Sequence, residues 1–227
     1  MKINGFQKLT LLDFPGKVAC IVFTPGCNFR CPFCHNASLV THIDGESIEE
    51  EEILSYLKKR QGLLDGVVVT GGEPTLQGDL ADFLGKVKAL GYAVKLDTNG
   101  TSPEKLKTLV EKGLVDYVAM DIKNTAAKYP VTAGCGSDVL GKVEESIDFL
   151  LADTVDYEFR TTVTAELHTP QDIGDIAKRI KGAKRYFLQN FIDSGDIVSP
   201  GNTPVTPQVM AEMVKTAQDL VGSASAR

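Results

Sequence analysis

Three cysteines lie close together in the segment TPGCNFRCPFCHN, as Cys27, Cys31 and Cys34. Three thiolates from one short loop can converge on a single centre, and soft sulfur ligands select zinc or an iron–sulfur cluster. A structural zinc site takes four ligands, and His35 could supply the fourth. A four-iron cluster held by three cysteines would instead keep one iron open for an outside ligand. The spacing therefore indicates a metal centre, and both kinds remain open.

A glycine pair and a carboxylate follow the second apolar run, as Gly71, Gly72 and Glu73. Glycines allow close backbone approach and unusual φ angles, and the carboxylate can accept hydrogen bonds from an ammonium group. A Gly-Gly pair by itself is usually a plain turn. Its place after a predicted strand, together with the cysteine loop, favours a binding role.

Further polar residues come at the ends of later apolar runs. Asp97 and Thr98 follow one run, and Asp121 and Lys123 follow the next. The oxygens of Asp97, Thr98 and Asp121 could hold a monovalent cation or the hydroxyls of a cofactor, and Lys123 could pair with a cofactor's carboxylate. An ordinary turn and a solvated ion pair are the plainer alternatives. Arg160 interrupts another apolar run. Because a buried arginine needs a partner, Arg160 either pairs with a structural acid or belongs to a site.

Short apolar runs alternate with amphipathic stretches along most of the chain. The runs are typical of buried parallel strands, and the stretches between them repeat apolar residues at helical spacing. Ser47 and Glu50 have the spacing of a capping box, and Pro103 and Pro170 suit the first turn of a helix. The predicted strands are 19–24, 66–70, 92–97, 115–122, 157–163 and 185–191, and the predicted helices are 47–60, 79–90, 103–112, 138–151, 170–181 and 207–221.

Strands that alternate with helices imply parallel pairing through βαβ crossovers. Six units are too few to close an eight-stranded barrel, so we expect an α/β fold, an open partial (β/α)6 barrel with parallel strands; a flat doubly wound sheet is the alternative. The carboxyl ends of the strands would share one mouth, where α/β barrels place their sites. We expect a single domain over residues 1–227, with its core at about 17–192, a C-terminal helix at about 207–221 and a frayed tail.

The composition is typical of a soluble protein. The chain of 227 residues carries 24 Lys and Arg against 30 Asp and Glu, a net charge of −6, and its pI is about 5.2. This balance favours neither nucleic acid nor a membrane surface as a partner, and no apolar run approaches the roughly 20 residues of a membrane span. Five cysteines with three clustered are unlike a disulfide framework, so we expect a reducing cytoplasm. His42 and His168 are expected to be surface groups in loops.

The cysteine loop, with Phe33 as its aromatic residue, resembles the C-x3-C-x-aromatic-C signature of the radical S-adenosylmethionine superfamily. The motifs DFPGK, CHN, TGGEP, LDTNG, MDIKN and YEFRTTV occur in the order seen in the glycyl-radical-enzyme activating proteins of that superfamily. The resemblance covers most of residues 1–192. Within this branch the motifs are most similar to those of activators of anaerobic ribonucleoside-triphosphate reductase, with pyruvate formate-lyase activators as near relatives.

The resemblance implies two cofactors. It implies a [4Fe–4S] cluster held by Cys27, Cys31 and Cys34, with S-adenosyl-L-methionine on the open iron, and it makes a monovalent cation a further candidate. The glycine motif would line the amino-acid end of S-adenosylmethionine, and Asn190 would meet its adenine. The residues that it implies as cofactor-binding are Phe33, His35, Gly71, Gly72, Glu73, Asp97, Thr98, Asp121, Lys123, Arg160 and Asn190.

The implied reaction needs no acid or base from the protein. An electron from a flavodoxin or ferredoxin would enter through the cluster, S-adenosylmethionine would be cleaved, and the resulting radical would take a hydrogen atom from a glycine of a partner glycyl radical enzyme. Anaerobic ribonucleoside-triphosphate reductase is the first candidate partner. Two other interpretations remain: a small-molecule radical enzyme such as 7-carboxy-7-deazaguanine synthase, and a non-enzymatic module built on a Cys3His zinc.

Overall fold

One sheet forms the centre of the molecule. A computed structural model describes residues 1–41 and 46–227, and within them eight strands are hydrogen-bonded in the order β1 to β8. Strands β2 to β7 correspond to the six predicted strands, and each pairs in parallel with the next. The strands are β1 (Gly5–Thr10), β2 (Ala19–Thr24), β3 (Gly66–Gly71), β4 (Ala93–Thr98), β5 (Tyr117–Asp121), β6 (Asp156–Val163), β7 (Tyr186–Asn190) and β8 (Ala224–Ala226).

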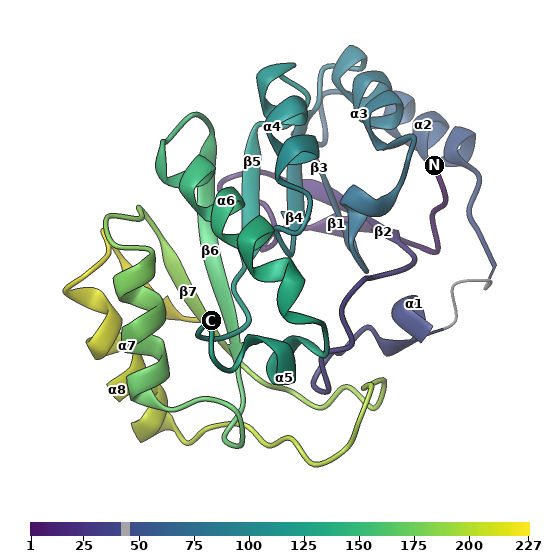
Figure 1. Ribbon diagram of the computed structural model, residues 1–227. Helices are drawn as coiled ribbons and strands as arrows, with labels where there is room; N and C mark the ends of the chain where they lie inside the picture. Colours follow the sequence, from purple (N-terminus) through teal and green to yellow (C-terminus); the bar gives the residue numbers. More distant parts are fainter. Residues whose placement is uncertain (42–45) are drawn as a thin grey trace.

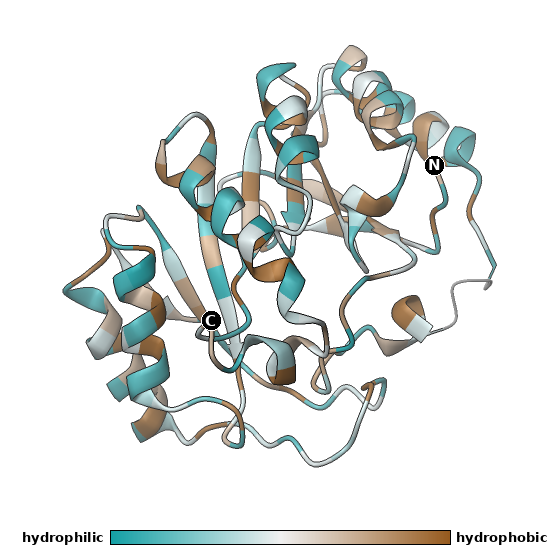
Figure 2. Cartoon of the chain, in the orientation of Figure 1, coloured by the Kyte–Doolittle hydropathy of each residue, from teal (hydrophilic) through white to brown (hydrophobic). Residues whose placement is uncertain are grey.

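Six longer helices lie along one face of the sheet (Figure 1). Their apolar sides face the strands, and Figure 2 shows hydrophobic and hydrophilic residues alternating along them, as amphipathic helices require. They are α2 (Glu50–Lys59), α3 (Leu80–Ala89), α4 (Pro103–Glu111), α6 (Leu140–Leu151), α7 (Pro170–Arg179) and α8 (Pro207–Gln218). The shorter elements are α1 (Ala37–Thr41), α5 (Tyr129–Ala133), η1 (Pro74–Leu76) and η2 (Ser137–Val139).

The predicted fold class is confirmed. Parallel strands alternate with helices, and the two edge strands of the described sheet, β1 and β8, do not pair with each other, so the barrel stays open. Because the strands β2 to β7 are parallel, their carboxyl ends lie at one edge. Among the helices of residues 1–41 and 46–227, none combines the length and the apolar character that a membrane span needs.

Two edge strands extend the sheet beyond the expected core. Strand β1 runs antiparallel to β2, and β8 pairs with β7 in the tail that was expected to fray. Arg227 anchors this tail, because its guanidinium donates to the carboxylate of Glu158 at 3.1 Å. The prediction of a frayed tail is therefore wrong. The three small residues of β8 have no sequence pattern typical of a strand, and they form one only because they pair with β7.

The starts of the helices agree only partly with expectation. Pro103 and Pro170 do lie in the first turns of α4 and α7. The predicted capping box is not formed, because α2 begins at Glu50 and its N-cap makes no side-chain hydrogen bond. The carboxylate of Glu50 instead accepts from Lys86 of α3 at 2.6 Å. A tertiary ion pair thus replaces the local cap.

Candidate functional site

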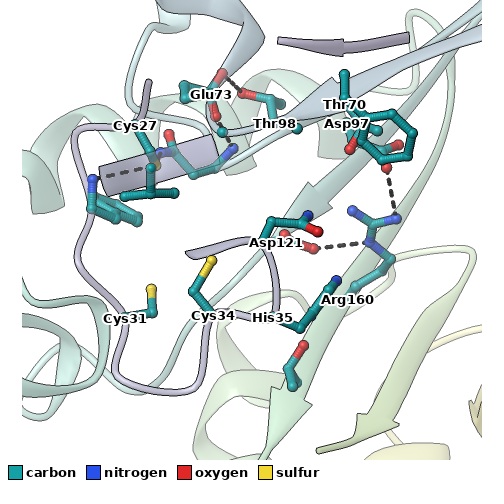
Figure 3. Close-up of a pocket in the computed structure, with 18 of the residues that line it drawn as sticks. Cys27, Cys31, Cys34, His35, Thr70, Glu73, Asp97, Thr98, Asp121 and Arg160 are labelled. Atoms are coloured by element: carbon teal, nitrogen blue, oxygen red, sulfur yellow. Dashed lines mark hydrogen bonds and ion pairs between the residues drawn. The ribbon is translucent and has the colours of Figure 1, made fainter. Parts of the chain in front are cut away.

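The loop between β2 and α1 brings the three clustered cysteines to one cavity of about 400 Å³. Figure 3 shows Cys31 and Cys34 pointing from this loop into the space that Asp121 and Arg160 enter from the strands. Of the fourteen predicted site residues, only Asn190 is not among those that line the cavity. The structure thus unites residues from β3, β4, β5, β6 and the cysteine loop at the carboxyl ends of the strands.

Contacts with α5 and with the connection between β6 and α7 hold the cysteine loop in place. The amide of Arg30 donates to the carbonyl of Ala133 in α5 at 2.8 Å. The buried ring of Phe29 meets Tyr129 edge to face at 6.1 Å between centroids. The ring of Phe33 meets His168 in the same way at 6.3 Å. These buried apolar contacts fix the loop between α5 and the β6–α7 connection.

Gly71 and Gly72 let the end of β3 pack closely against the backbone of residues 24–26. A Cβ on Gly71 would lie 2.4 Å from the carbonyl oxygen of Thr24, and φ there is +118°. A Cβ on Gly72 would lie 2.0 Å from the carbonyl oxygen of Gly26. The amide of Glu73 also donates to that oxygen at 2.7 Å. The close approach predicted for these glycines is therefore made to the chain itself, where the end of β3 presses against the residues before Cys27.

The carboxylate of Glu73 is buried and fully engaged within the chain. One oxygen accepts from the amide and hydroxyl of Thr75 at 3.1 and 2.6 Å and from the hydroxyl of Thr98 at 2.8 Å. The other oxygen accepts from the amide of Asn99 at 2.6 Å. Burial raises the pKa of Glu73, and these hydrogen bonds oppose the rise. Its carboxylate thus joins the ends of β3 and β4, a role that sequence reasoning missed.

Five charged residues form a partly buried network across three neighbouring strands. Arg160 donates to Asp121 at 2.9 Å and to Asp97 at 3.2 Å. Lys123 donates to Asp121 at 3.1 Å, and Lys95 binds Asp97. Burial alone would raise the pKa of both carboxyls, but Arg160 and the two lysines hold the pKa values of Asp97 and Asp121 below their ordinary values. Both acids are therefore ionised.

The network has consequences for the predicted ligands. Two carboxylates face three cations, so the group carries a net charge of 3 − 2, or +1. Of the three cations, Lys123 and Arg160 line the cavity, where their N–H groups can bind an anionic ligand such as a carboxylate. The network works against a monovalent cation at Asp97 and Asp121, because both acids already have cationic partners. The hydroxyl of Thr98 is likewise committed to Glu73.

Two predicted positions differ from expectation. The side chain of Asn190 donates to the carbonyl of Val205 and accepts from its amide, each at 3.0 Å. It ties β7 to the segment before α8, while the adjacent Gln189 lines the cavity. His168 was expected at the surface, but it is buried. Its Nδ1 accepts from the amide of Thr164, which leaves Nε2 to donate to the carbonyl of Lys123 at 2.8 Å. His42 lies outside the described residues.

Several lining residues carried little or no sequence signal. Gln7 and Asp13 belong to the β1–β2 hairpin, which was not predicted. Thr162 lines the cavity two residues beyond Arg160, on the same face of β6. The period of two along a strand could have identified Thr162 once Arg160 had been chosen.

The donor set fits an iron–sulfur cluster, because such clusters are held by cysteine thiolates and the three thiols line one cavity. Within residues 1–41 and 46–227, no three His, Cys, Asp or Glu side chains gather closely enough to hold a single ion. Burial raises the pKa of Cys27 to about 11 and that of Cys31 to about 12. These thiols are therefore neutral at pH 7 without metal, and a metal must displace their protons.

Relatives of known kind match most or part of the chain. It is 36% identical over 195 residues to a protein of Methanocaldococcus jannaschii named as a glycyl-radical enzyme activating enzyme, covering 83% of this chain and 79% of that one. It is 31% identical over 128 residues to the pyruvate formate-lyase-activating enzyme of Clostridium pasteurianum, covering 54% and 52%. It is also 30% identical over 158 residues to the 7-carboxy-7-deazaguanine synthase of Koribacter versatilis, covering 66% and 63%.

A solved structure shares the fold. Streptococcus suis SuiB bound to S-adenosylmethionine superposes with a TM-score of 0.70 at 12% identity, covering 91% of this chain and 51% of SuiB. The chain thus spans about half the length of that protein. The model of the radical SAM superfamily matches residues 21–148, more than half of the chain. With the three-cysteine loop at the carboxyl ends of a parallel, open barrel, this match shows that the chain belongs to the radical SAM superfamily.

Proposed function

We propose that this protein is the activating enzyme of a glycyl radical enzyme. Membership of the radical SAM superfamily implies a [4Fe–4S] cluster and S-adenosylmethionine, which when bound supply one-electron cleavage of a sulfonium and abstraction of a hydrogen atom. The observation that carries the proposal is the cavity itself, because it joins the three thiols to Lys123 and Arg160, which Asp121 holds in place. The similarity to the M. jannaschii protein over most of both chains supports the activating role.

The residues of the chain divide the work of the site. Cys27, Cys31 and Cys34 would hold the cluster at the edge of the cavity. Lys123 and Arg160, held by Asp97 and Asp121, would offer positive charge to the carboxylate of S-adenosylmethionine. The glycine pair and Glu73 fix the wall between the cluster loop and β4, and the buried rings of Phe29 and Phe33 exclude water beneath the loop. The protein thus contributes positioning and electrostatics rather than an acid or a base.

The partner that we favour is anaerobic ribonucleoside-triphosphate reductase. The motifs YEFRTT and FLQNF motivate this choice over pyruvate formate-lyase. A flavodoxin or ferredoxin would deliver the electron, and the cytoplasm would keep the thiols reduced. We expect one domain to carry these activities.

Electron paramagnetic resonance tests the proposal. The anaerobically reconstituted, reduced protein is mixed with S-adenosylmethionine and each candidate partner, and a glycyl doublet is expected on a glycyl radical enzyme. A doublet on pyruvate formate-lyase alone would change the partner. No doublet on any partner would refute the activating role. Turnover of a deazapurine precursor without a protein partner would favour the alternative that the similarity to 7-carboxy-7-deazaguanine synthase supports.

Metal analysis tests the ligands separately. Cys31→Ser should abolish iron uptake and cleavage of S-adenosylmethionine together. Cys135→Ser is the matched control, because Cys135 does not line the cavity, and it should take up iron like the wild type. One zinc per chain and no iron in anaerobically purified protein would refute the cluster.

A further inference from the structure

Tyr129 carries a hydroxyl without a function in the site described so far. Its side chain is 2% exposed, and the hydroxyl has no hydrogen-bond partner within residues 1–41 and 46–227. Buried polar groups are almost always hydrogen-bonded, so an exception points to a missing partner. A phenol can donate one hydrogen bond and accept others.

Tyr129 lies on the face of α5 that packs against the cysteine loop. Tyr129 and Ala133 are four residues apart in α5, on the same face of the helix. The carbonyl of Ala133 accepts from the amide of Arg30 at 2.8 Å and from the thiol of Cys31 at 3.7 Å. The ring of Tyr129 packs on Phe29. This face of α5 therefore covers the part of the loop that carries Cys31.

The electrostatics of the phenol point to the same neighbours. Burial raises the pKa of Tyr129, Lys123 opposes the rise, and Cys31 and Asp121 add to it. The hydroxyl therefore keeps its proton at pH 7 and remains a donor. The backbone amide of Lys123 lies near enough to the phenol oxygen to lower its pKa, but an N–H group can only donate and cannot accept the hydroxyl hydrogen. What the hydroxyl lacks is an acceptor.

Metal binding would create that acceptor. Cys31 now holds its own proton and directs it to Ala133. As a metal ligand Cys31 must lose this proton, since thiolates are the ligands of iron–sulfur clusters. Its sulfur then changes from a weak donor to a negatively charged acceptor, next to the face of α5 that carries the unpartnered hydroxyl.

We propose that Tyr129 donates a hydrogen bond to the sulfur of metal-bound Cys31 and thereby raises the reduction potential of the cluster. Hydrogen bonds to the sulfurs of an iron–sulfur cluster are among the factors that set its potential, because they stabilise the more negative, reduced form. Tyr129 is thus a positioning residue of the cluster. The inference rests on the cluster of the proposed function and not on the identity of the partner enzyme.

A potentiometric titration followed by electron paramagnetic resonance tests the inference. In reconstituted Tyr129→Phe, the ratio of reduced to oxidised cluster at a fixed potential should fall about tenfold, which for a one-electron couple is about 59 mV. Tyr92→Phe is the matched control, because its buried hydroxyl is bonded to the carbonyl of Leu57 in α2, at 2.7 Å. It should leave the potential unchanged. An unchanged potential in Tyr129→Phe would overturn the inference.

Two further measurements separate this role from a structural one. The metal-free Tyr129→Phe protein should unfold at no lower denaturant concentration than the wild type, because no hydrogen bond is lost. If the variant takes up no iron, the proton couplings of the reduced wild-type cluster are compared in H₂O and in D₂O. A coupling from the phenol proton should disappear in D₂O, and the Tyr92→Phe protein should show the same coupling as the wild type. Absence of this exchangeable coupling would refute the inference. If Tyr129→Phe shows the expected shift in potential but the wild type forms no glycyl radical on any partner, the proposed function is refuted and this inference stands.

Discussion

Replacement of Glu73 by glutamine tests whether its carboxylate serves the fold or a ligand. In the variant, the amide oxygen of the new side chain could keep the three hydrogen bonds that one carboxylate oxygen now accepts from Thr75 and Thr98. The amide nitrogen would then face the N–H of Asn99, where a donor meets a donor. Losing a hydrogen bond to a charged group costs about 1.5–3 kcal/mol, and neutralising a buried charge offsets part of this. We expect Glu73→Gln to destabilise the metal-free protein by about 2 kcal/mol, about 30-fold in the folding equilibrium.

Two measurements separate the roles of Glu73. Urea denaturation of the metal-free protein reports its role in the fold, and the affinity of the reconstituted protein for S-adenosylmethionine reports any role in binding the ligand. Glu104→Gln is the matched control, since the side chain of Glu104 is 85% exposed and its substitution should change stability by less than about 0.5 kcal/mol. If Glu73→Gln unfolds like the wild type while the affinity for S-adenosylmethionine falls tenfold, the carboxylate acts on the ligand. That result would contradict the assignment of Glu73 to the junction of β3 and β4.

Three other substitutions probe the backbone, the charges and the pH response. Gly72→Ala should lose about 3 kcal/mol of stability and take up less iron, because its Cβ would meet a carbonyl oxygen at 2.0 Å; Gly85→Ala, with open space around it, should do neither in urea titrations and iron assays. Arg160→Gln should lower the free energy of unfolding in urea by about 3 kcal/mol, and a loss below about 1 kcal/mol would show that the ion pairs of Arg160 are not shielded from water. Burial lowers the pKa of His168 from its ordinary 6.5, so the unfolded chain binds the proton more readily and the stability of the fold decreases as the pH drops below 6.5. His168→Gln should reduce this loss of stability, measured by urea denaturation between about pH 7.5 and 5.5. The same loss in the variant and the wild type would contradict the role of His168.

The central strands could be predicted because burial on both faces leaves a nearly continuous apolar run. The run at 19–24 matches β2, and the run at 115–122 contains β5. The edge strands lack this signal: β1 exposes most of its residues at least partly, and β8 has three small ones. Their strand form depends on a neighbour that local sequence does not reveal.

The positions of the site residues were predictable, but their partners were only partly so. Parallel topology takes the ends of the central strands to one edge, which places Asp97 and Asp121 there, and the register of β6 sets Arg160 beside Asp121. Whether Glu73 binds a ligand or the next strand depends on the path of the chain after β3. The burial of His168 likewise depends on a loop that folds back beneath Phe33. Such long-range contacts leave no trace in residue type or spacing.

Strands β4, β5 and β6 are joined at their carboxyl ends by oppositely charged side chains rather than by apolar ones alone. The two aspartates and Arg160 expose between 13% and 28% of their side chains, so mobile ions reach them poorly. Dissolved salt at 0.1 M screens exposed charges that lie more than about 10 Å apart, but it acts much less on buried or partly buried pairs. The width of the barrel mouth should therefore stay constant across the ionic strengths found in cells, and a charged cofactor would meet the same geometry in dilute and in concentrated surroundings.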